Sequence, residues 1–416
     1  MIRSQNSSDD VLPRRAIVLG AGVVGVATAY ALARRGVEVT IIDRASIAGS
    51  GASFANGAQL SYIYTDALAS NSLLKRLPSL ALGVDSSFRL RPNLDPSQIA
   101  WFMAFLRNCT HQRFLENSLA GLQLGLESQL AMHALLEQHK IEFGHQSAGK
   151  MLVYDDAAAF KSACDMVSVR QKHGAEQEIL TPNEAVNKEA ALAERAGGFI
   201  GAIYSPREEL GDPHKFCNAL LSQLVKAYGV QVRLATEVES WNADSDTVMV
   251  TTKAGETIAC DQLVMCAGMD ANNLLKKHGL GATLMPMKGY SFTAAPGQAS
   301  PKMSITDVSR KVVFCPLDGA IRVAGLAELG VRNTRVDQRQ LGTLVSAAAG
   351  VLPRAADYAA SYQGWAGIRP MTANALPIIR KIAPRVTINV GHGMLGWTYA
   401  MGSAERAARL LGGVWS

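Results

Sequence analysis

A glycine-rich turn near the amino end has the spacing of a dinucleotide-binding site. The stretch 20–25 reads G-A-G-V-V-G, after an apolar run and before an alanine-rich one. Gly20 permits a tight turn, Gly22 lets backbone amides approach a pyrophosphate, and Gly25 lets a helix pack closely on a strand. Asp43 follows after about 20 residues, where a carboxylate can hold two ribose hydroxyls. We therefore predict that this turn binds a dinucleotide; a glycine turn that binds nothing is the alternative.

Arg369 is the single charge most suggestive of substrate binding. It lies in the stretch 364–372, which reads G-W-A-G-I-R-P-M-T. A guanidinium in such a partly apolar stretch needs an anionic partner, and a substrate carboxylate would serve through a bidentate pair. An internal salt bridge is the alternative.

Three further stretches can bring backbone close to a bound cofactor. The stretch 391–393, G-H-G, precedes a helix and offers amides to an anionic group such as a reduced flavin ring. His392 could act there as a general base or only hold the backbone near the cofactor. The small-residue loop 48–59 leaves its backbone polar groups accessible, although an ordinary surface loop is also compatible. A strand that ends in C-A-G at 266–268 predicts a second close approach.

These residues must be positioned by alternating strands and helices. Hydrophobic periodicity predicts helices over 99–108 and 115–139, with Leu119, Leu122, Leu126, Leu130 and Leu135 on one apolar stripe. The other predicted elements are strands at 16–19, 37–42, 150–154, 262–265, 290–294, 312–315, 320–325 and 386–391, and helices at 156–172, 213–227, 337–350 and 399–411.

Length and composition predict an α/β protein of two domains. The chain has 416 residues, 48% hydrophobic and only 18% charged, and a single core rarely grows beyond about 300 residues. Segments 14–74, 198–282 and 363–416 have strand-glycine-helix character and form one discontinuous domain. Segments 75–197 and 283–362 form the other, with long helices and antiparallel-looking strands. Residues 1–13 are predicted to be a disordered leader.

Several classes of function lack support. The formal charge of +6 is scattered in pairs, so no dense basic run argues for nucleic acid. The histidines do not show H-x-H or H-E-x-x-H spacing, which leaves no metal site, and no G-x-S-x-G elbow indicates a hydrolase. A single G-x-G-x-x-G predicts one dinucleotide, and this motif by itself leaves NAD and FAD open.

Cysteine usage and hydropathy favour a cytoplasmic protein. The six cysteines include no C-x-x-C pair and read as reduced thiols. The apolar run 16–33 is split by its glycine turn into pieces shorter than the ~20 residues of a membrane span. Residues 1–13 are polar, unlike a signal peptide. The apolar region 60–106 leaves peripheral contact with a membrane open.

Taken together, the motifs resemble the FAD-dependent D-amino-acid oxidase superfamily, most closely its bacterial D-amino-acid dehydrogenase small-subunit type. The resemblance covers 17–411. It implies a Rossmann-like FAD-binding domain of the glutathione-reductase type, interleaved with an antiparallel-sheet substrate domain. The matching stretches are 18–27 (V-L-G-A-G-V-V-G-V-A), 53–59 (S-F-A-N-G-A-Q), 107–109 (R-N-C), 211–212 (G-D), 286–291 (P-M-K-G-Y-S), 321–328 (I-R-V-A-G-L-A-E), 367–372 (G-I-R-P-M-T) and 391–398 (G-H-G-M-L-G-W-T).

The resemblance implies non-covalent FAD and assigns roles to individual residues. Arg369 would grip the substrate carboxylate, and Tyr290 and His392 are the other catalytic candidates. The ADP half would lie on the glycine turn and Asp43, with Val238 near the adenine, and the isoalloxazine near 393–398. The full set of expected cofactor contacts is Gly20, Gly22, Val23, Val24, Gly25, Asp43, Arg44, Ser53, Asn56, Gly57, Ala58, Gln59, Val238, Ala267, Gly268, Gly391, Gly393, Met394, Leu395, Gly396, Trp397 and Thr398.

The implied reaction is oxidative deamination of a D-amino acid to a 2-oxo acid and ammonia, with hydride transfer from Cα to flavin N5. Electrons would pass to a quinone or similar respiratory acceptor, and a homo- or hetero-oligomer is open. Two departures from the family pattern, Glu208-Glu209 and Ala373-Asn374, leave the substrate side chain open. The alternatives are D-proline or hydroxyproline, glycine or an opine as substrate of a complex, and, in another class, a non-catalytic flavin-binding assembly protein.

Overall fold

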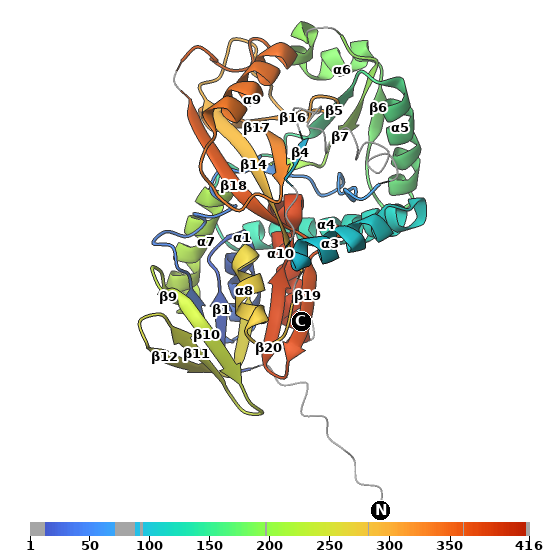
Figure 1. Ribbon diagram of the computed structural model, residues 1–416. Helices are drawn as coiled ribbons and strands as arrows, with labels where there is room; N and C mark the ends of the chain where they lie inside the picture. The colour runs from blue at the N-terminus through green and yellow to red at the C-terminus, as the bar shows by residue number, and fades with distance from the viewer. Residues whose placement is uncertain are drawn as a thin grey trace, which may run out of the picture.

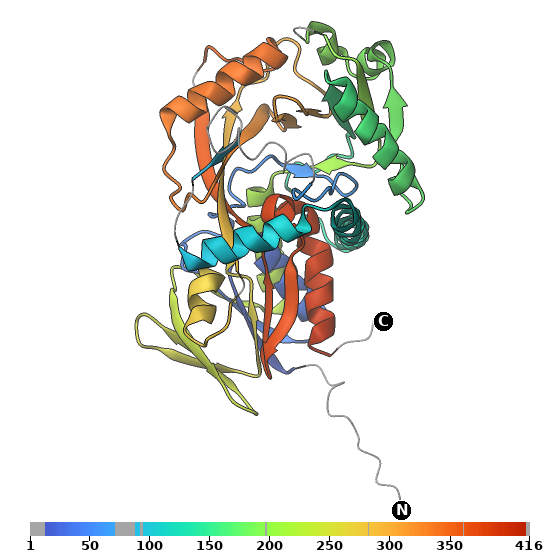
Figure 2. The ribbon, with the colours of Figure 1, turned by 45° about the vertical axis from the view of Figure 1, so that its right-hand side comes forward.

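The computed structural model describes residues 13–70, 88–91, 95–195, 198–281, 283–360 and 362–412. Its described part forms two lobes, one above the other in Figure 1. Two helices run across the junction between the lobes, as Figure 2 shows. They are α3 (Pro96–Asn108) and α4 (His111–Gln138). The predicted leader lies almost wholly outside the described residues.

The lower lobe contains the sheet that carries the glycine turn. In the described part of the chain this sheet has six strands, parallel except where its first two pair antiparallel. Their order is β19 (Ile378–Ala383), β20 (Val386–Val390), β13 (Gln262–Met265), β1 (Arg15–Leu19), β2 (Glu38–Ile42) and β9 (Gln231–Arg233). A smaller sheet beside it contains β10 (Val238–Ala243), β11 (Val248–Thr252) and β12 (Thr257–Cys260).

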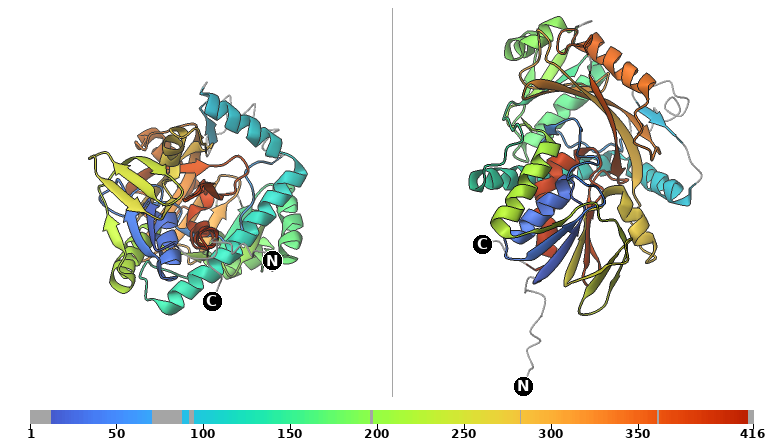
Figure 3. Two further views of the ribbon diagram at one scale, coloured as in Figure 1. Left: turned by 90° about the horizontal axis from the view of Figure 1, so that it is seen from below. Right: turned by 90° about the vertical axis from the view of Figure 1, so that its left-hand side faces the viewer.

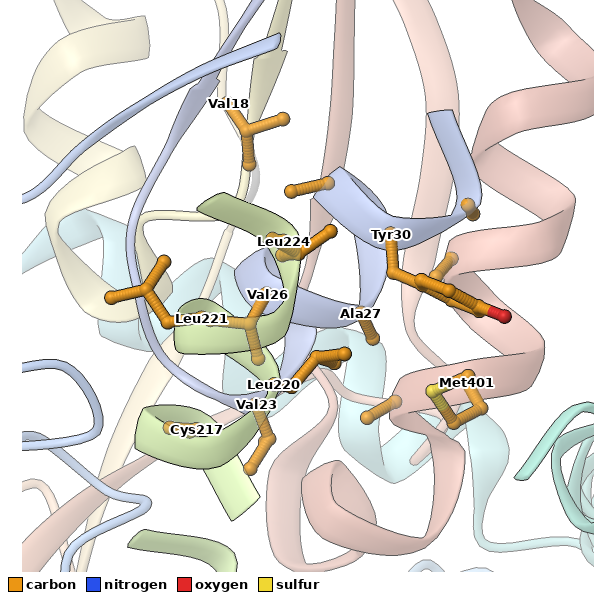
Figure 4. Packing of buried hydrophobic residues seen from close by; sticks show 14 of the residues in the cluster. Val18, Val23, Val26, Ala27, Tyr30, Cys217, Leu220, Leu221, Leu224 and Met401 are labelled. Carbon is orange, nitrogen blue, oxygen red and sulfur yellow. The ribbon is translucent and has the colours of Figure 1, made fainter. Parts of the chain in front are cut away.

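A central helix, α1 (Val23–Ala33), anchors the lower lobe. All its residues except Val24 are buried. Small side chains such as Ala27 let α7 (Pro213–Tyr228) and α10 (Gly396–Leu410) pack closely on it, with Val26, Leu224 and Met401 among the side chains in this cluster (Figure 4). This packing holds the amino end of α1 rigidly beside the glycine turn.

The upper lobe is built on a larger, mostly antiparallel sheet. Among the described residues it has nine strands. Eight follow one path: β18 (Gln363–Met371), β14 (Met285–Ala294), β17 (Ala320–Leu329), β16 (Val312–Leu317), β15 (Ser304–Asp307), β5 (Lys150–Tyr154), β7 (Gly201–Ser205) and β6 (Glu178–Leu180). The ninth, β4 (Phe88–Leu90), pairs with β17.

The two faces of this larger sheet have different neighbours. α9 (Gln338–Val351) covers one face, which we name the apolar face, through Leu341 and Leu344. We name the opposite face, which carries Arg369 and Ser291, the polar face. The remaining elements are α5 (Ala157–Gln171), α6 (Pro182–Lys188), α8 (Ala271–Lys276), the short pair β3 (Gln59–Leu60) and β8 (Glu209–Leu210), and the 3-10 turns η1 (Ala190–Glu194), η2 (Gly268–Asp270) and η3 (Gly393–Leu395).

Two strands pair within the larger sheet although the predicted domain boundaries assign them to the other domain. β7 and β18 belong to the larger sheet, whereas the predicted boundaries group both with the glycine turn. The reason is non-local: β18 pairs with β14 along nine residue pairs, from Met285–Met371 to Thr293–Gln363. Such a register joins segments some 80 residues apart, which local periodicity does not reveal.

The predicted helices at 99–108, 156–172 and 213–227 are confirmed by α3, α5 and α7. The leucine stripe of α4 is partly wrong, because Leu130 is exposed. The buried stripe instead runs through Gly121, Gly125 and Met132. A Cβ at Gly125 would lie 2.1 Å from the carbonyl oxygen of Tyr62. Glycine therefore lets this face of α4 approach the backbone around Tyr62. Figure 3 shows α4 along the flank of the lower lobe, where it packs on α10.

Candidate active site

The glycine turn brings the ends of β1 and β13 into close backbone contact. Gly20 has a φ of +113°, and a Cβ there would lie 2.6 Å from the carbonyl oxygen of Cys266. A Cβ at Gly25 would lie only 1.8 Å from the carbonyl oxygen of Gly20. Both glycines are therefore required by the fold itself. They also place Cys266 and Ala267 beside the turn; the approach of 266–268 to a cofactor stays a prediction.

Gly22 differs, because the protein alone does not require a glycine there. A Cβ at Gly22 would meet only the Ser53 hydroxyl oxygen, at 3.3 Å. Gly22 is the N-cap of α1 and makes no side-chain cap, while the next amide, of Val23, donates to Ser53 Oγ at 3.2 Å. The amino end of α1, with Val24 in its first turn, thus keeps open space before it. This arrangement fits a phosphate held by helix amides.

Asp43 follows β2 and lies against the glycine turn. Its two carboxylate oxygens accept hydrogen bonds from the backbone amides of Ala21, at 2.6 Å, and Ala45, at 2.8 Å. Each oxygen keeps a further lone pair for a hydroxyl. The Asp43 carbonyl accepts from Thr236, two residues before the predicted adenine neighbour Val238. Arg44, the next residue, forms an exposed ion pair with Asp270, with 3.1 Å between Nη2 and Oδ2.

The segment 55–61 lies between the two lobes against the polar face. Ser291 Oγ donates to the carbonyl of Ala55, and Arg322 Nη1 donates to that of Asn56 at 3.1 Å. Gly57 lies beside Ala324, and Ala58 is buried. The Gln59 amide donates to Ser304 Oγ. The structure thus brings Asn56, Gly57, Ala58 and Gln59 together along the junction.

Arg369 lies on the polar face at the edge strand β18. Its guanidinium stacks on Gly289 of β14, where a Cβ would lie 2.5 Å from the guanidinium carbon. No hydrogen bond or ion pair joins this guanidinium to any residue in the described ranges. Burial lowers its pKa to about 10, so it stays charged at neutral pH. Arg369 is half-buried. A half-buried cation without a counter-ion among the described residues indicates an anionic ligand; the salt-bridge alternative is not supported.

Gly289 sets the position of this guanidinium, and its substitution should move it. We expect Gly289→Ala to raise KM for the substrate about tenfold and to leave kcat within a few fold, because the added methyl group displaces the guanidinium but removes none of its charge. Steady-state kinetics with the flavin spectrum as a loading control measure this. An unchanged KM would show that Arg369 tolerates displacement or does not bind substrate.

The stretch 391–398 belongs to the lower lobe and contacts β18, the strand that carries Arg369. β18 packs against both η2 and η3, and a Cβ at Gly393 would lie 3.0 Å from Met371 Sδ. Gly391 and Gly393 have φ values of +81° and +55°, a region that favours glycine. Met394 is exposed and Leu395 is the residue before α10, which begins at Gly396.

The last two residues of this stretch have contacts of their own. The buried Thr398 accepts a hydrogen bond from the amide of Ser61 at 3.0 Å and so joins 391–398 to the segment 55–61. Trp397 packs on Phe143 and Phe216, and its indole donates to the carbonyl of Gly211 at 3.2 Å. Trp397 therefore supports the stretch from behind.

Two predicted catalytic residues do not reach the face that carries Arg369. Tyr290 points to the apolar face, since side chains alternate along β14, and its hydroxyl donates to Glu328 Oε2 at 2.8 Å. His392 is buried, with Nε2 2.9 Å from Ser403 Oγ. Burial lowers the pKa of His392 to about 3, which keeps the ring neutral. Both side chains therefore bind other side chains, Glu328 and Ser403, away from Arg369.

Sequence reasoning missed three polar residues that hold the junction. Ser291 and Arg322 bind the carbonyls of the segment 55–61, and Lys150 binds Gln59 and Ser61. The available signal was a polar residue within an otherwise apolar strand, as in K-M-L-V-Y at 150–154. Within the described ranges no cluster of histidine, cysteine, aspartate or glutamate could hold a metal ion.

Comparisons with known proteins show the family of the chain. The chain is 37% identical over 405 residues to D-amino acid dehydrogenase 2 of Ralstonia nicotianae, covering 95% of each chain. It is 34% identical to a D-amino acid dehydrogenase of Paramagnetospirillum magneticum, covering 96% of this chain and 95% of the other. A solved structure of glycine oxidase from Geobacillus kaustophilus shares the fold, with a TM-score of 0.74 at 21% identity over 96% of this chain and 94% of that one. The family described as DAO, FAD dependent oxidoreductase, matches residues 15–410, and the chain therefore belongs to this family of FAD-dependent oxidoreductases.

Proposed function

We propose that this enzyme oxidises free D-amino acids to imino acids, which water hydrolyses to 2-oxo acids and ammonia. The observation that carries the proposal is Arg369, a half-buried guanidinium without a partner among the described residues, on the strand β18 that packs against η3. A carboxylate is the anion that its planar fork fits best in an amino acid. The D configuration is supported by the relatives that are 37% and 34% identical, both of which are named D-amino acid dehydrogenases.

The residues around the junction fit FAD. The open amino end of α1 and Gly22 would hold the pyrophosphate, Asp43 the ribose, and Val238 would lie near the adenine. The isoalloxazine would lie between the segment 55–61 and the stretch 391–398. Bound FAD supplies the acceptor for the hydride that leaves Cα.

The chain's own residues would bind and orient the substrate. Arg369 would hold the carboxylate and thereby fix the position of Cα, while the polar face and the segment 55–61 exclude water around it. Positioning of this kind can contribute much of a rate enhancement without a dedicated base. Since His392 is neutral and bonded to Ser403, and Tyr290 is bonded to Glu328, neither is assigned proton transfer in this proposal.

Anaerobic reduction of the purified yellow protein tests the proposal directly. Bleaching of the flavin by D-amino acids, but not by their L forms, is the expected result. The panel includes D-proline, D-hydroxyproline, glycine and an opine, because Glu208-Glu209 and Ala373-Asn374 leave the side-chain preference open. Bleaching only by one of these four would shift the substrate class, and no bleaching by any amine would favour a non-catalytic flavin-binding role.

We further propose that electrons pass to a membrane quinone during peripheral contact with the cytoplasmic membrane face. Within the described residues, no helix combines the length and apolar character needed to cross a bilayer. Ile99 and Met103 are one turn apart on α3, 48% and 49% exposed, and offer an apolar surface for such contact. Mixing the substrate-reduced protein with a ubiquinone analogue or with oxygen compares the two acceptors. Faster reoxidation by oxygen would overturn the quinone proposal. We also propose that the protein forms a homo- or hetero-oligomer.

A further inference from the structure

Lys150 is a buried ammonium at the far end of the polar face. It opens β5 and is only 3% exposed, although the rest of β5 is apolar. It pairs in register with Ser304 of β15. The strands of Lys150 and Arg369, β5 and β18, are five positions apart in the order of the sheet. Lys150 is therefore separate from Arg369, the residue proposed to bind the substrate carboxylate.

Two neutral acceptors, both on the segment between the lobes, bind this ammonium. Lys150 Nζ donates to Gln59 Oε1 at 3.1 Å and to Ser61 Oγ at 2.7 Å. It also lies 4.7 Å from the centre of the Tyr64 ring. Because an ammonium has only donors, this set of partners suits its charged form.

The nearby carboxylate does not form a direct ion pair with Lys150. Glu208, 1% exposed, accepts from the backbone amides of Ile63 and Tyr64 through Oε1. Its Oε2 has no hydrogen-bond partner among the described residues. Burial lowers the pKa of Lys150 and raises that of Glu208, while each group's charge opposes the shift of the other. Cys315, the other titratable neighbour, is buried, and burial raises its thiol pKa to about 12.

The charge of Lys150 offsets that of the buried Glu208, and removal of one of two such buried charges is destabilising, so Lys150 has a structural role. Its hydrogen bonds also converge on the proposed flavin site: Gln59 belongs to it, and Ser61 binds Thr398 of the stretch 391–398 through its amide, 3.0 Å away. Lys150 thus holds the side chain of Ser61, and the backbone amide of the same residue joins the two segments proposed to flank the isoalloxazine.

We propose that Lys150 is a positioning residue for the flavin, which holds Gln59 and Ser61 in place and keeps a positive charge beside the cofactor. The inference rests on the proposed FAD site. A positive charge stabilises the form of the cofactor that has gained electrons, and so Lys150 makes the bound flavin easier to reduce.

Neutral variants at this position test the proposal. In Lys150→Met and Lys150→Gln, we expect the ratio of reduced to oxidised flavin at a given potential to fall about tenfold, a shift of about −30 mV for two electrons. Lys150→Arg should recover most of the wild-type potential. Equilibration of the FAD-loaded protein against a reference dye measures the potential, and the flavin absorption spectrum reports its surroundings.

Lys161→Met on the exposed face of α5 is the matched control, since Lys161 pairs among the described residues with Asp165 alone, at 3.3 Å. Its potential should equal that of the wild type. The proposed role of Lys150 is wrong if either neutral variant folds, loads with FAD and keeps the wild-type potential and spectrum. A wild-type protein that binds no FAD would instead overturn the proposed cofactor site.

Discussion

Arg369→Ala should raise KM for amino acids about 100-fold or more, while the protein keeps its yellow flavin spectrum. The variant removes two charge-assisted hydrogen bonds, each worth about 1.5–3 kcal/mol. The guanidinium makes no contact with another described residue that its loss would leave unpaired, so folding should be little affected. Steady-state kinetics measure KM, and thermal unfolding compares stability.

A graded response would identify the guanidinium geometry as the cause. Arg369→Lys keeps the charge but loses the planar fork, so its KM should lie between those of wild type and Arg369→Ala. Arg380→Ala is the matched control, because Arg380 is exposed on β19. Wild-type KM in Arg369→Ala would rule out the carboxylate clamp.

Gly22→Ala and Gly25→Ala should separate cofactor binding from folding. At Gly25 the added Cβ would lie 1.8 Å from a backbone oxygen, so we expect the apo-protein to lose more than about 3 kcal/mol of unfolding free energy. At Gly22 the added Cβ meets only the flexible Ser53 side chain, at 3.3 Å. Gly22→Ala should therefore leave apo-protein stability nearly unchanged and weaken FAD binding about 10- to 100-fold.

Urea unfolding of the apo-proteins and FAD titration by fluorescence provide the two readouts. Gly342→Ala on α9 is the control, because nothing lies within 4 Å of a Cβ there. It should keep wild-type FAD affinity and be slightly stabilised by helix propensity. Wild-type FAD affinity in Gly22→Ala would show that the pyrophosphate does not approach this residue.

The local parts of the fold were predictable because short-range rules set them. The turn 20–25 combines an apolar strand, three spaced glycines and an alanine-rich helix, and each of these signals lies within about 20 residues. The structure shows the steric need for Gly20 and Gly25 at that turn. Helices such as α5 and α7 begin at the side-chain caps Asp156 and Asp212, which also act locally.

The sequence by itself determined the nucleotide-binding turn, the α/β class and the candidate residue Arg369, since periodicity, glycine spacing and residue type are local properties. Only the tertiary structure decided that β18 joins the larger sheet and that Arg369 stacks on Gly289. It also decided that Tyr290 faces away, and that Lys150 reaches Gln59 and Ser61. Each of these depends on strand register, which places residues on one face or the other through contacts between distant segments.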